Sequence, residues 1–152
     1  MALFLGLDSS TQSLSALVID TDARRVVLDQ SIVYGSALPE YRSPHGFLEN
    51  ADPAVKHSDP RMWLEALDRL FEKIKASGFD LGGIAGISGA GQQHGSVYLK
   101  APLSQTTWST KSSLSAQLAP LLSRPTAPIW MDSSTGADCR AIAEAVELQR
   151  KR

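Results

Sequence analysis

Three apolar segments, separated by two short polar turns, fill the first 33 residues of the chain. Residues 3–7 form a continuous apolar run of the kind found in strands that are buried on both faces. This run ends abruptly at the polar residues 8–13, and a second run covers residues 14–19. A turn at 20–23 with two aspartates then leads into residues 25–33, which are rich in β-branched and aliphatic side chains. The pattern predicts three consecutive strands of one sheet.

A helix is predicted after residues 34–57, which lack a clear period and read as surface loop. Asp59 followed by Pro60 is typical of a helix start, and Gly78 is typical of a helix end. Apolar side chains between them recur at helical spacing on one face, which consists of Trp63, Leu67, Leu70, Phe71 and Ile74. The spacing predicts that this face packs on the sheet.

The second half of the chain alternates between predicted strands and loops. Residues 82–88 form a strand so poor in side chains that we expect another group to approach its backbone closely. A polar, glycine-rich loop at 89–95 leads to a further strand at 96–99. Residues 101–127 contain ten Ser or Thr, three Pro and no acidic residue, which indicates a long loop or insertion. Residues 128–132 then predict a short strand that ends in a carboxylate.

The chain is predicted to close with a helix that begins near Thr135. Its expected inward face consists of Ala141, Ile142, Ala145 and Val146. Strands and helices in this order indicate one α/β layer structure.

Composition narrows the class of function. A hydrophobic fraction of 43% and a charged fraction of 20% are globular values. The net charge of −1 argues against binding to nucleic acid or to an acidic membrane surface. The single cysteine excludes an internal disulfide and a multi-thiolate metal site. Because there is no basic leader and no apolar stretch near the ~20 residues of a membrane span, we expect a soluble, cytoplasmic protein.

The first segment with chemical potential is the turn after the first strand. Asp8 directly follows the buried run and precedes several hydroxyl and amide side chains. Such a turn presents backbone N–H groups and hydroxyls to phosphate oxygens, and its carboxylate can hold a Mg²⁺ that bridges them. A simple turn cap is the alternative interpretation.

Two later segments also follow predicted strands. Residues 89–95 contain three glycines, two glutamines and His94, which suit a polyhydroxylated ligand better than a bare turn. Asp132, preceded by the aromatic Trp130, suits hydroxyl binding at a pocket wall. The alternative for Asp132 is that it caps the following helix.

Taken in this order, the three segments resemble the N-terminal part of the FGGY carbohydrate kinases, and within them the xylulokinases. Residues 6–13 look like the first phosphate motif of that family. Residues 88–96 are similar to its sugar-binding loop in the form found in eukaryotic-type xylulokinases, and residues 128–135 resemble the strand and turn that follow.

The resemblance implies a ribonuclease-H-like (actin-like ATPase) fold, with a mixed five-stranded sheet whose second strand is antiparallel and which is flanked by helices. It implies that residues 1–152 are a partial N-terminal domain, and that the general base and the C-terminal ATP-binding domain lie beyond residue 152. The implied reaction is ATP-dependent phosphorylation of D-xylulose to D-xylulose 5-phosphate, for which this chain alone would be inactive. The sugar, ATP and Mg²⁺ are the implied small molecules, and a homodimer is compatible with the resemblance.

The resemblance also assigns roles to individual residues. The phosphate-facing residues would be Asp8, Thr11 and Gln12, with Asp8 also holding Mg²⁺. The sugar-binding residues would be Gln93 and His94, with Asp132 at the rim of their pocket. Ser15 stands where many relatives have Lys or Arg, which removes a phosphate contact.

Two other functions are open at this point. A non-catalytic sugar-binding or regulatory module fits because the general base is missing from the sequence. A nuclease of the ribonuclease-H type would need several carboxylates converging on two metal ions. The absence of acidic residues between Asp80 and Asp132 disfavours the nuclease.

Overall fold

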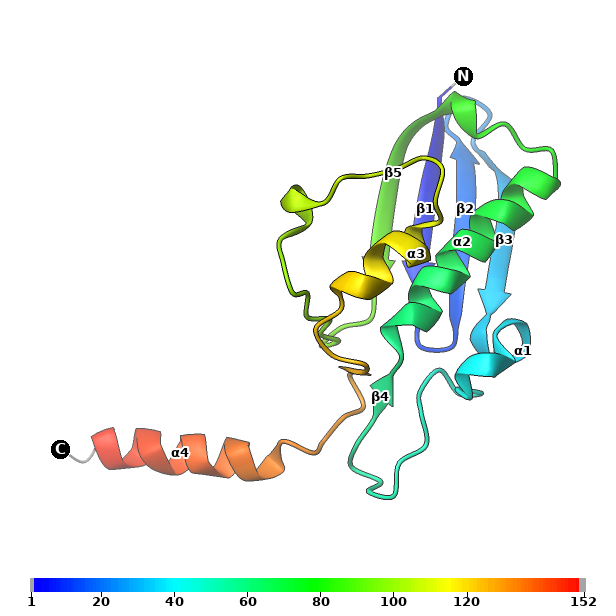
Figure 1. Cartoon of the computed structure of the whole chain (residues 1–152). Helices are drawn as coiled ribbons and strands as arrows, with labels where there is room; N and C mark the ends of the chain where they lie inside the picture. The colour runs from blue at the N-terminus through cyan, green and yellow to red at the C-terminus, as the bar shows by residue number, and fades with distance from the viewer. Residues whose placement is uncertain (1, 151–152) are drawn as a thin grey trace.

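The computed structural model of the chain describes residues 2–150, and its centre is a mixed four-stranded sheet in the order β3-β2-β1-β5 (Figure 1). β1 (Leu3–Ser9) and β2 (Ser13–Asp20) are antiparallel, and β2 is antiparallel to β3 (Arg25–Val33). β5 (Ile84–Gly91) pairs with β1 in parallel. The three predicted N-terminal strands and the antiparallel second strand are therefore confirmed.

The expected fifth strand does not join this sheet within the described part of the chain. Residues 96–99 contribute only an isolated bridge. The segment expected as a strand at 128–132 supplies only β6 (Ala127–Pro128), which pairs with β4 (His57–Ser58) in a separate two-stranded sheet. Proline has no N–H to donate to a strand ladder, and Pro128 accordingly marks the end of β6.

The predicted helix forms as α2 (Pro60–Ala76). The Asp59 carboxylate caps it by accepting the Arg61 backbone N–H at 2.9 Å, and Gly78 follows its end with a φ of +78°. The buried stripe consists of Met62, Ala66, Leu70 and Ile74, so Leu70 and Ile74 are confirmed as inward-facing, while Met62 and Ala66 take the buried positions expected of Trp63 and Leu67. Trp63, Leu67 and Phe71 flank this stripe and are half-buried.

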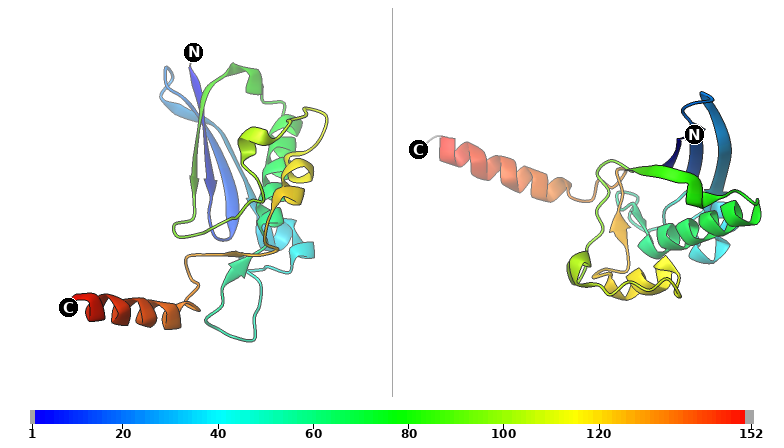
Figure 2. Two further views of the ribbon diagram at one scale, coloured as in Figure 1. Left: turned by 60° about the vertical axis from the view of Figure 1, so that its left-hand side comes forward. Right: turned by 90° about the horizontal axis from the view of Figure 1, so that it is seen from above.

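The core lies between α2 and one face of the sheet. Figure 2 shows α2 and α3 on the same side of the strands. The sheet contributes Leu5, Leu14, Ala16, Val18, Leu28 and Ile32 to this core. The opposite face carries exposed apolar side chains, namely Phe4, Leu17, Ile19, Val26 and Val33. Helices therefore flank only one face of the sheet within residues 2–150.

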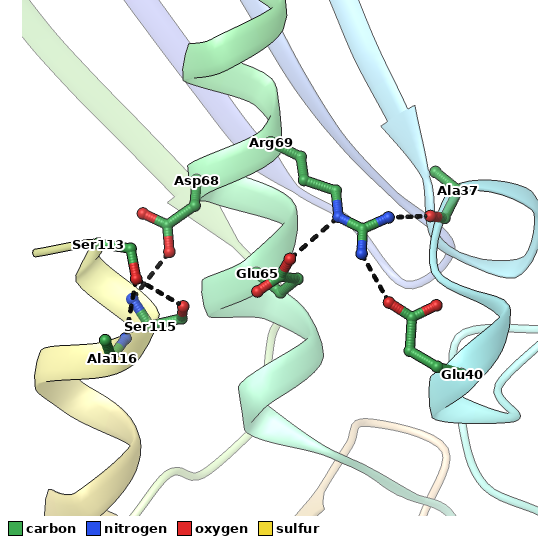
Figure 3. A network of polar contacts seen from close by, with 8 residues as sticks. All are labelled: Ala37, Glu40, Glu65, Asp68, Arg69, Ser113, Ser115 and Ala116. Carbon is green, nitrogen blue, oxygen red and sulfur yellow. Dashed lines mark hydrogen bonds and ion pairs between the residues drawn. The ribbon is translucent and has the colours of Figure 1, made fainter.

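The segment 101–127, expected as a loop, contains three short helices: η3 (Leu103–Gln105), α3 (Leu114–Leu118) and η4 (Ala119–Leu121). The carboxylate of Asp68 on α2 accepts the backbone N–H groups of Leu114 and Ser115, the first two residues of α3, at 2.9 and 2.8 Å. Figure 3 shows the bond from Ser115. A carboxylate on a neighbouring helix thus caps α3, which sequence spacing could not reveal because the two lie 46 residues apart.

The opposite flank of α2 holds the chain that follows β3. Arg69 donates to Glu65 on its own helix at 3.0 Å and to Glu40 at 2.6 Å (Figure 3). It also donates to the carbonyl of the last residue of α1 (Tyr34–Ala37). Glu40 belongs to the 3₁₀ turn η1 (Pro39–Tyr41), so one guanidinium connects α2, α1 and η1.

The last helix, α4 (Gly136–Arg150), begins where predicted, but its side chains are exposed along its whole described length, apart from the half-buried Gly136 at its start. The expected inward packing of Ala141, Ile142, Ala145 and Val146 is wrong, because α4 projects away from the sheet (Figure 1). Among residues 2–150, no helix combines the length and the apolar character that crossing a membrane requires.

Candidate functional site

The three motif segments meet at one edge of the sheet. Parallel pairing of β1 with β5 places Asp8 opposite Ala90 and Ser9 opposite Gly91. Ligands of open α/β sheets bind outside the carboxyl ends of such strands. A pocket of about 340 Å³ lies at this edge, lined by Asp8, Ser10, Thr11, Gly91, Gln92, Gln93, His94 and Trp130.

Hydrogen bonds between distant parts of the sequence hold this pocket together. The Trp130 indole N–H donates to the Thr11 hydroxyl at 3.0 Å, across 119 residues. The Gln92 amide donates from Nε2 to the Ser10 carbonyl at 3.3 Å. The first segment is therefore bonded to both of the others.

The turn after β1 places an exposed carboxylate close to several hydroxyl groups. The Ser10 hydroxyl donates to Asp8 Oδ2 at 2.5 Å, and the Ser10 N–H donates to the Ser13 carbonyl at 2.9 Å. Thr11 accepts from the Trp130 indole, and its own hydroxyl proton is left to donate. Asp8 is exposed, and Mg²⁺ is commonly held by one or two carboxylates together with waters and phosphate oxygens. An exposed carboxylate beside a hydroxyl donor fits that coordination.

A buried tyrosine supports this turn from the core. The Tyr34 side chain is fully buried, and its hydroxyl donates to the Ser10 carbonyl at 3.4 Å and lies 3.3 Å from the Ser9 hydroxyl. Burial raises the pKa of Tyr34, so the phenol keeps the proton that it donates. In the sequence, the only sign of this role of Tyr34 is an aromatic side chain directly after a predicted strand.

The glycine-rich segment divides between strand and loop. β5 extends through Gly91, so only residues 92–95 form the loop. His94 has a φ of +56°, in the left-handed region that non-glycine residues rarely adopt. The expected close approach occurs at Gly86, where an added Cβ would lie 3.2 Å from the Phe4 ring. At Gly91 an added Cβ would meet nothing within 4 Å of the described chain, which leaves the backbone beside the pocket open.

Four of the six residues assigned to ligands line the pocket: Asp8, Thr11, Gln93 and His94. The Gln12 side chain is exposed outside the lining, and its carbonyl accepts the Tyr34 N–H at 2.9 Å. Asp132 also lies outside the lining. Trp130 lines the pocket at the position where Asp132 was expected. Ser10 and Gln92 complete the polar lining.

Asp132 is fully engaged with its surroundings. Its Oδ2 accepts the Lys56 N–H at 2.8 Å and lies 3.3 Å from His57 Nε2, while His57 Nδ1 lies 2.9 Å from the Thr126 hydroxyl. Its Oδ1 accepts the Ser134 hydroxyl at 2.6 Å and the Ser134 N–H at 3.1 Å. These bonds, led by the one from the Ser134 hydroxyl, lower the pKa of Asp132, against the opposing effect of burial.

Because folding lowers the pKa of Asp132, protonation of its carboxylate at acidic pH should reduce the free energy of unfolding. A carboxyl whose pKa is lowered by folding contributes stability above its unfolded pKa, near 3.9, and loses it as the pH falls through the lowered value. We expect Asp132→Asn to remove about 1 kcal/mol of unfolding free energy at pH 7, and a smaller amount at pH 3. Urea unfolding at both pH values measures this, with the exposed Asp138→Asn as the control. An equal loss at both pH values would contradict the assignment.

Within residues 2–150, no group of three or more His, Cys, Asp or Glu side chains is placed to hold a metal ion.

The structure matches solved sugar kinases over almost its whole length. A ligand-bound xylulose kinase from Lactobacillus acidophilus aligns with 99% of this chain and 24% of its own, with a TM-score of 0.64 and 16% identity. A gluconate kinase from the same organism aligns with 98% of this chain and 24% of its own, with a TM-score of 0.63 and 16% identity. At this level of identity the match shows the fold, which is that of the sugar kinases within the actin-like ATPases.

The sequence comparison is more specific. The chain is 41% identical over 144 residues to the xylulose kinase of Rattus norvegicus, which covers 93% of this chain and 27% of the relative. It is 38% identical over 148 residues to xylulose kinase 2 of Arabidopsis thaliana, covering 95% of this chain and 26% of the relative. The curated homologues are xylulose kinases, which confirms the resemblance to the N-terminal part of that family. The chain spans about a quarter of the length of these relatives, and no protein-family model matches it.

Proposed function

We propose that the pocket beside β1 and β5 binds D-xylulose next to the phosphates of ATP. The chain would be the sugar-side portion of a carbohydrate kinase that forms D-xylulose 5-phosphate. The observation that supports this best is that one pocket unites a phosphate-type turn, with Asp8 and Thr11, and a polar loop, with Gln93 and His94. Because the relatives are about four times longer, the proposal assigns the general base and the ATP-binding domain to sequence outside residues 1–152.

Phosphoryl transfer depends mainly on positioning and charge neutralisation. In the proposal, Asp8 holds Mg²⁺, which neutralises phosphate charge. The Thr11 hydroxyl, oriented by its bond from Trp130, donates to a phosphate oxygen. Gln12 is proposed as a further phosphate-facing residue, with its backbone fixed by the N–H of Tyr34. The reaction consumes ATP, and we place it in the cytoplasm.

The sugar-binding part of the proposal uses polar groups in front of an aromatic wall. Gln93 offers both a donor and an acceptor, and the His94 ring nitrogens offer the same in the neutral form. Trp130 is 55% exposed and provides an apolar surface for the C–H groups of a sugar. Asp132 is proposed to act at the rim, by fixing the segment that carries Trp130 through its bonds to Lys56 and Ser134.

Titration calorimetry of the intact natural protein with D-xylulose tests this proposal. We expect His94→Ala to weaken binding by about 1–3 kcal/mol, which is roughly 5- to 150-fold, because sugar hydroxyls lose a hydrogen-bond partner. His45→Ala, which removes an exposed histidine from another loop, is the matched control and should leave the affinity unchanged.

Two outcomes would decide against the proposal. Failure of the intact protein to bind D-xylulose would remove the sugar assignment. Sugar binding without any xylulose-dependent release of ADP would instead identify a non-catalytic sugar-binding module.

A further inference from the structure

Two buried side-chain atoms have no hydrogen-bond partner among residues 2–150: Trp63 Nε1 and Gln92 Oε1. Native proteins pair the large majority of such atoms, and each unpaired one costs about 1–3 kcal/mol. The indole nitrogen can only donate, whereas the amide oxygen can only accept. The indole nitrogen therefore lacks an acceptor, and the amide oxygen lacks a donor.

Both side chains line the same cavity. It has a volume of about 180 Å³ and lies between the ends of β1 and β5, α2 and the loop after β5. Its lining consists of Ser9, Trp63, Gly91, Gln92, Gly95 and Val97. Gly91 and Gln92 also line the main pocket, so the two spaces adjoin at these residues.

The orientation of the Gln92 amide is fixed by its surroundings. Nε2 donates to the Ser10 carbonyl, and a flipped amide would set two oxygens against each other. The Ser10 carbonyl also accepts the hydroxyl of the buried Tyr34. The unpaired atom is therefore the acceptor Oε1, held in place by a contact with the core.

The indole of Trp63 finds no polar partner in its other surroundings. Trp63 also lines a neighbouring cavity of about 150 Å³ between α2, α3 and η3. All other residues that line this second cavity are apolar, namely Pro60, Leu64, Val97, Leu99, Leu103, Leu118 and Leu122. The polar partner for the indole N–H is therefore to be sought in the space that Trp63 shares with Gln92.

We propose that the Trp63–Gln92 cavity is a hydroxyl-binding subsite, which takes one hydroxyl of the polyhydroxylated substrate in the main pocket. This inference rests on the proposed function and adds a specificity-determining residue, Trp63, on α2. A hydroxyl accepts from the indole N–H and donates to the amide oxygen, so it suits both unpaired atoms. A substrate without that hydroxyl would leave buried polar atoms unpaired, and sites of this kind discriminate strongly against such analogues.

The test compares Trp63→Phe, which keeps an aromatic ring but removes the N–H, with the wild-type protein. Titration calorimetry on the intact protein uses D-xylulose and its set of monodeoxy analogues. We expect the variant to bind D-xylulose about 5- to 20-fold more weakly. One monodeoxy analogue should bind wild type and variant equally, because it lacks the hydroxyl that Trp63 contacts. Trp108→Phe, at an exposed tryptophan, is the control and should change nothing.

Two results overturn the inference while the proposed function stands. One is an unchanged affinity of Trp63→Phe for D-xylulose. The other is a weakening by the same factor for every monodeoxy analogue, which indicates an ordered water or a packing effect at Trp63.

A second readout uses the wild-type protein alone and does not depend on the folding of a variant. The indole N–H signal of Trp63 in a ¹H–¹⁵N spectrum should shift when D-xylulose is added, while that of Trp108 stays in place. A signal that does not move at saturating sugar counts against the subsite. If D-xylulose fails to bind, a shift with glycerol or ribitol retains the subsite and removes the proposed substrate, whereas no shift with any of them rejects both.

Discussion

Replacing Gly46 with alanine is expected to remove about 4 kcal/mol or more of unfolding free energy, or to prevent folding. Gly46 has a φ of +83°, and a Cβ there would lie 1.7 Å from the carbonyl oxygen of Thr11. The position of the Cβ is fixed by the backbone of residue 46, and the Thr11 oxygen is itself a backbone atom, so no side-chain rotation relieves the contact. The Gly46 carbonyl also accepts the buried hydroxyl of Ser58, and its N–H donates to the Ser43 carbonyl at 2.9 Å, which restricts any retreat.

Gly78→Ala provides a matched control for that experiment. Gly78 has a similar φ of +78°, but a Cβ there would meet nothing within 4 Å. The control therefore carries only the cost of the left-handed backbone, about 1–2 kcal/mol. Urea unfolding of both variants gives the cost of the clash by difference. Equal losses of unfolding free energy in the two variants would show that the loop around Gly46 is not packed tightly against Thr11 in the turn after β1.

Asp8→Asn in the intact protein is expected to lower kcat for D-xylulose phosphorylation by at least about 100-fold, with little change in the affinity for the sugar. The amide keeps the size of the carboxylate but loses the charge that would hold Mg²⁺ in the proposed site, and charge neutralisation is a main contribution of such sites to phosphoryl transfer. Steady-state kinetics at several Mg²⁺ concentrations, with calorimetry for D-xylulose, separates the two effects.

The control for Asp8 is Glu72→Gln, which removes one negative charge from the exposed surface of α2. It should leave both kcat and sugar affinity unchanged. If Asp8→Asn instead weakened sugar binding as much as His94→Ala, Asp8 would be a sugar ligand rather than a metal ligand.

Local patterns predicted the three N-terminal strands and the main helix well. β3 matches its predicted bounds, and β1 and β2 extend past theirs by at most two residues. These elements follow from apolar runs and turn residues that act within a few positions of each other. The α2 boundaries follow from Asp59 and Gly78 for the same reason.

The misassigned features depend on contacts between residues that are distant in sequence, which local patterns do not reveal. Asp132 was expected at the pocket, but the Lys56 N–H, 76 residues away, binds its carboxylate. Had residues 128–132 formed a strand, Trp130 and Asp132 would point to the same face. The Asp132 N–H instead donates to the Ile129 carbonyl at 2.9 Å, so the chain turns here. Of the two side chains, only Trp130 lines the pocket. The predicted inward packing of α4 was wrong because an amphipathic pattern does not reveal which surface, if any, covers its apolar face.

The order of strands in the sheet bears on how the site assembles. The β1–β2 and β2–β3 pairings close loops of three and four residues, whereas 74 residues separate the end of β1 at Ser9 from the start of β5 at Ile84. The entropy lost on closing a loop rises with its length, and distant pairings slow folding. The three N-terminal strands can therefore form early as a meander, and we expect the pocket to appear only when β5 docks beside β1. A newly made chain would thus acquire its ligand-binding competence late, after most of its core is already in place.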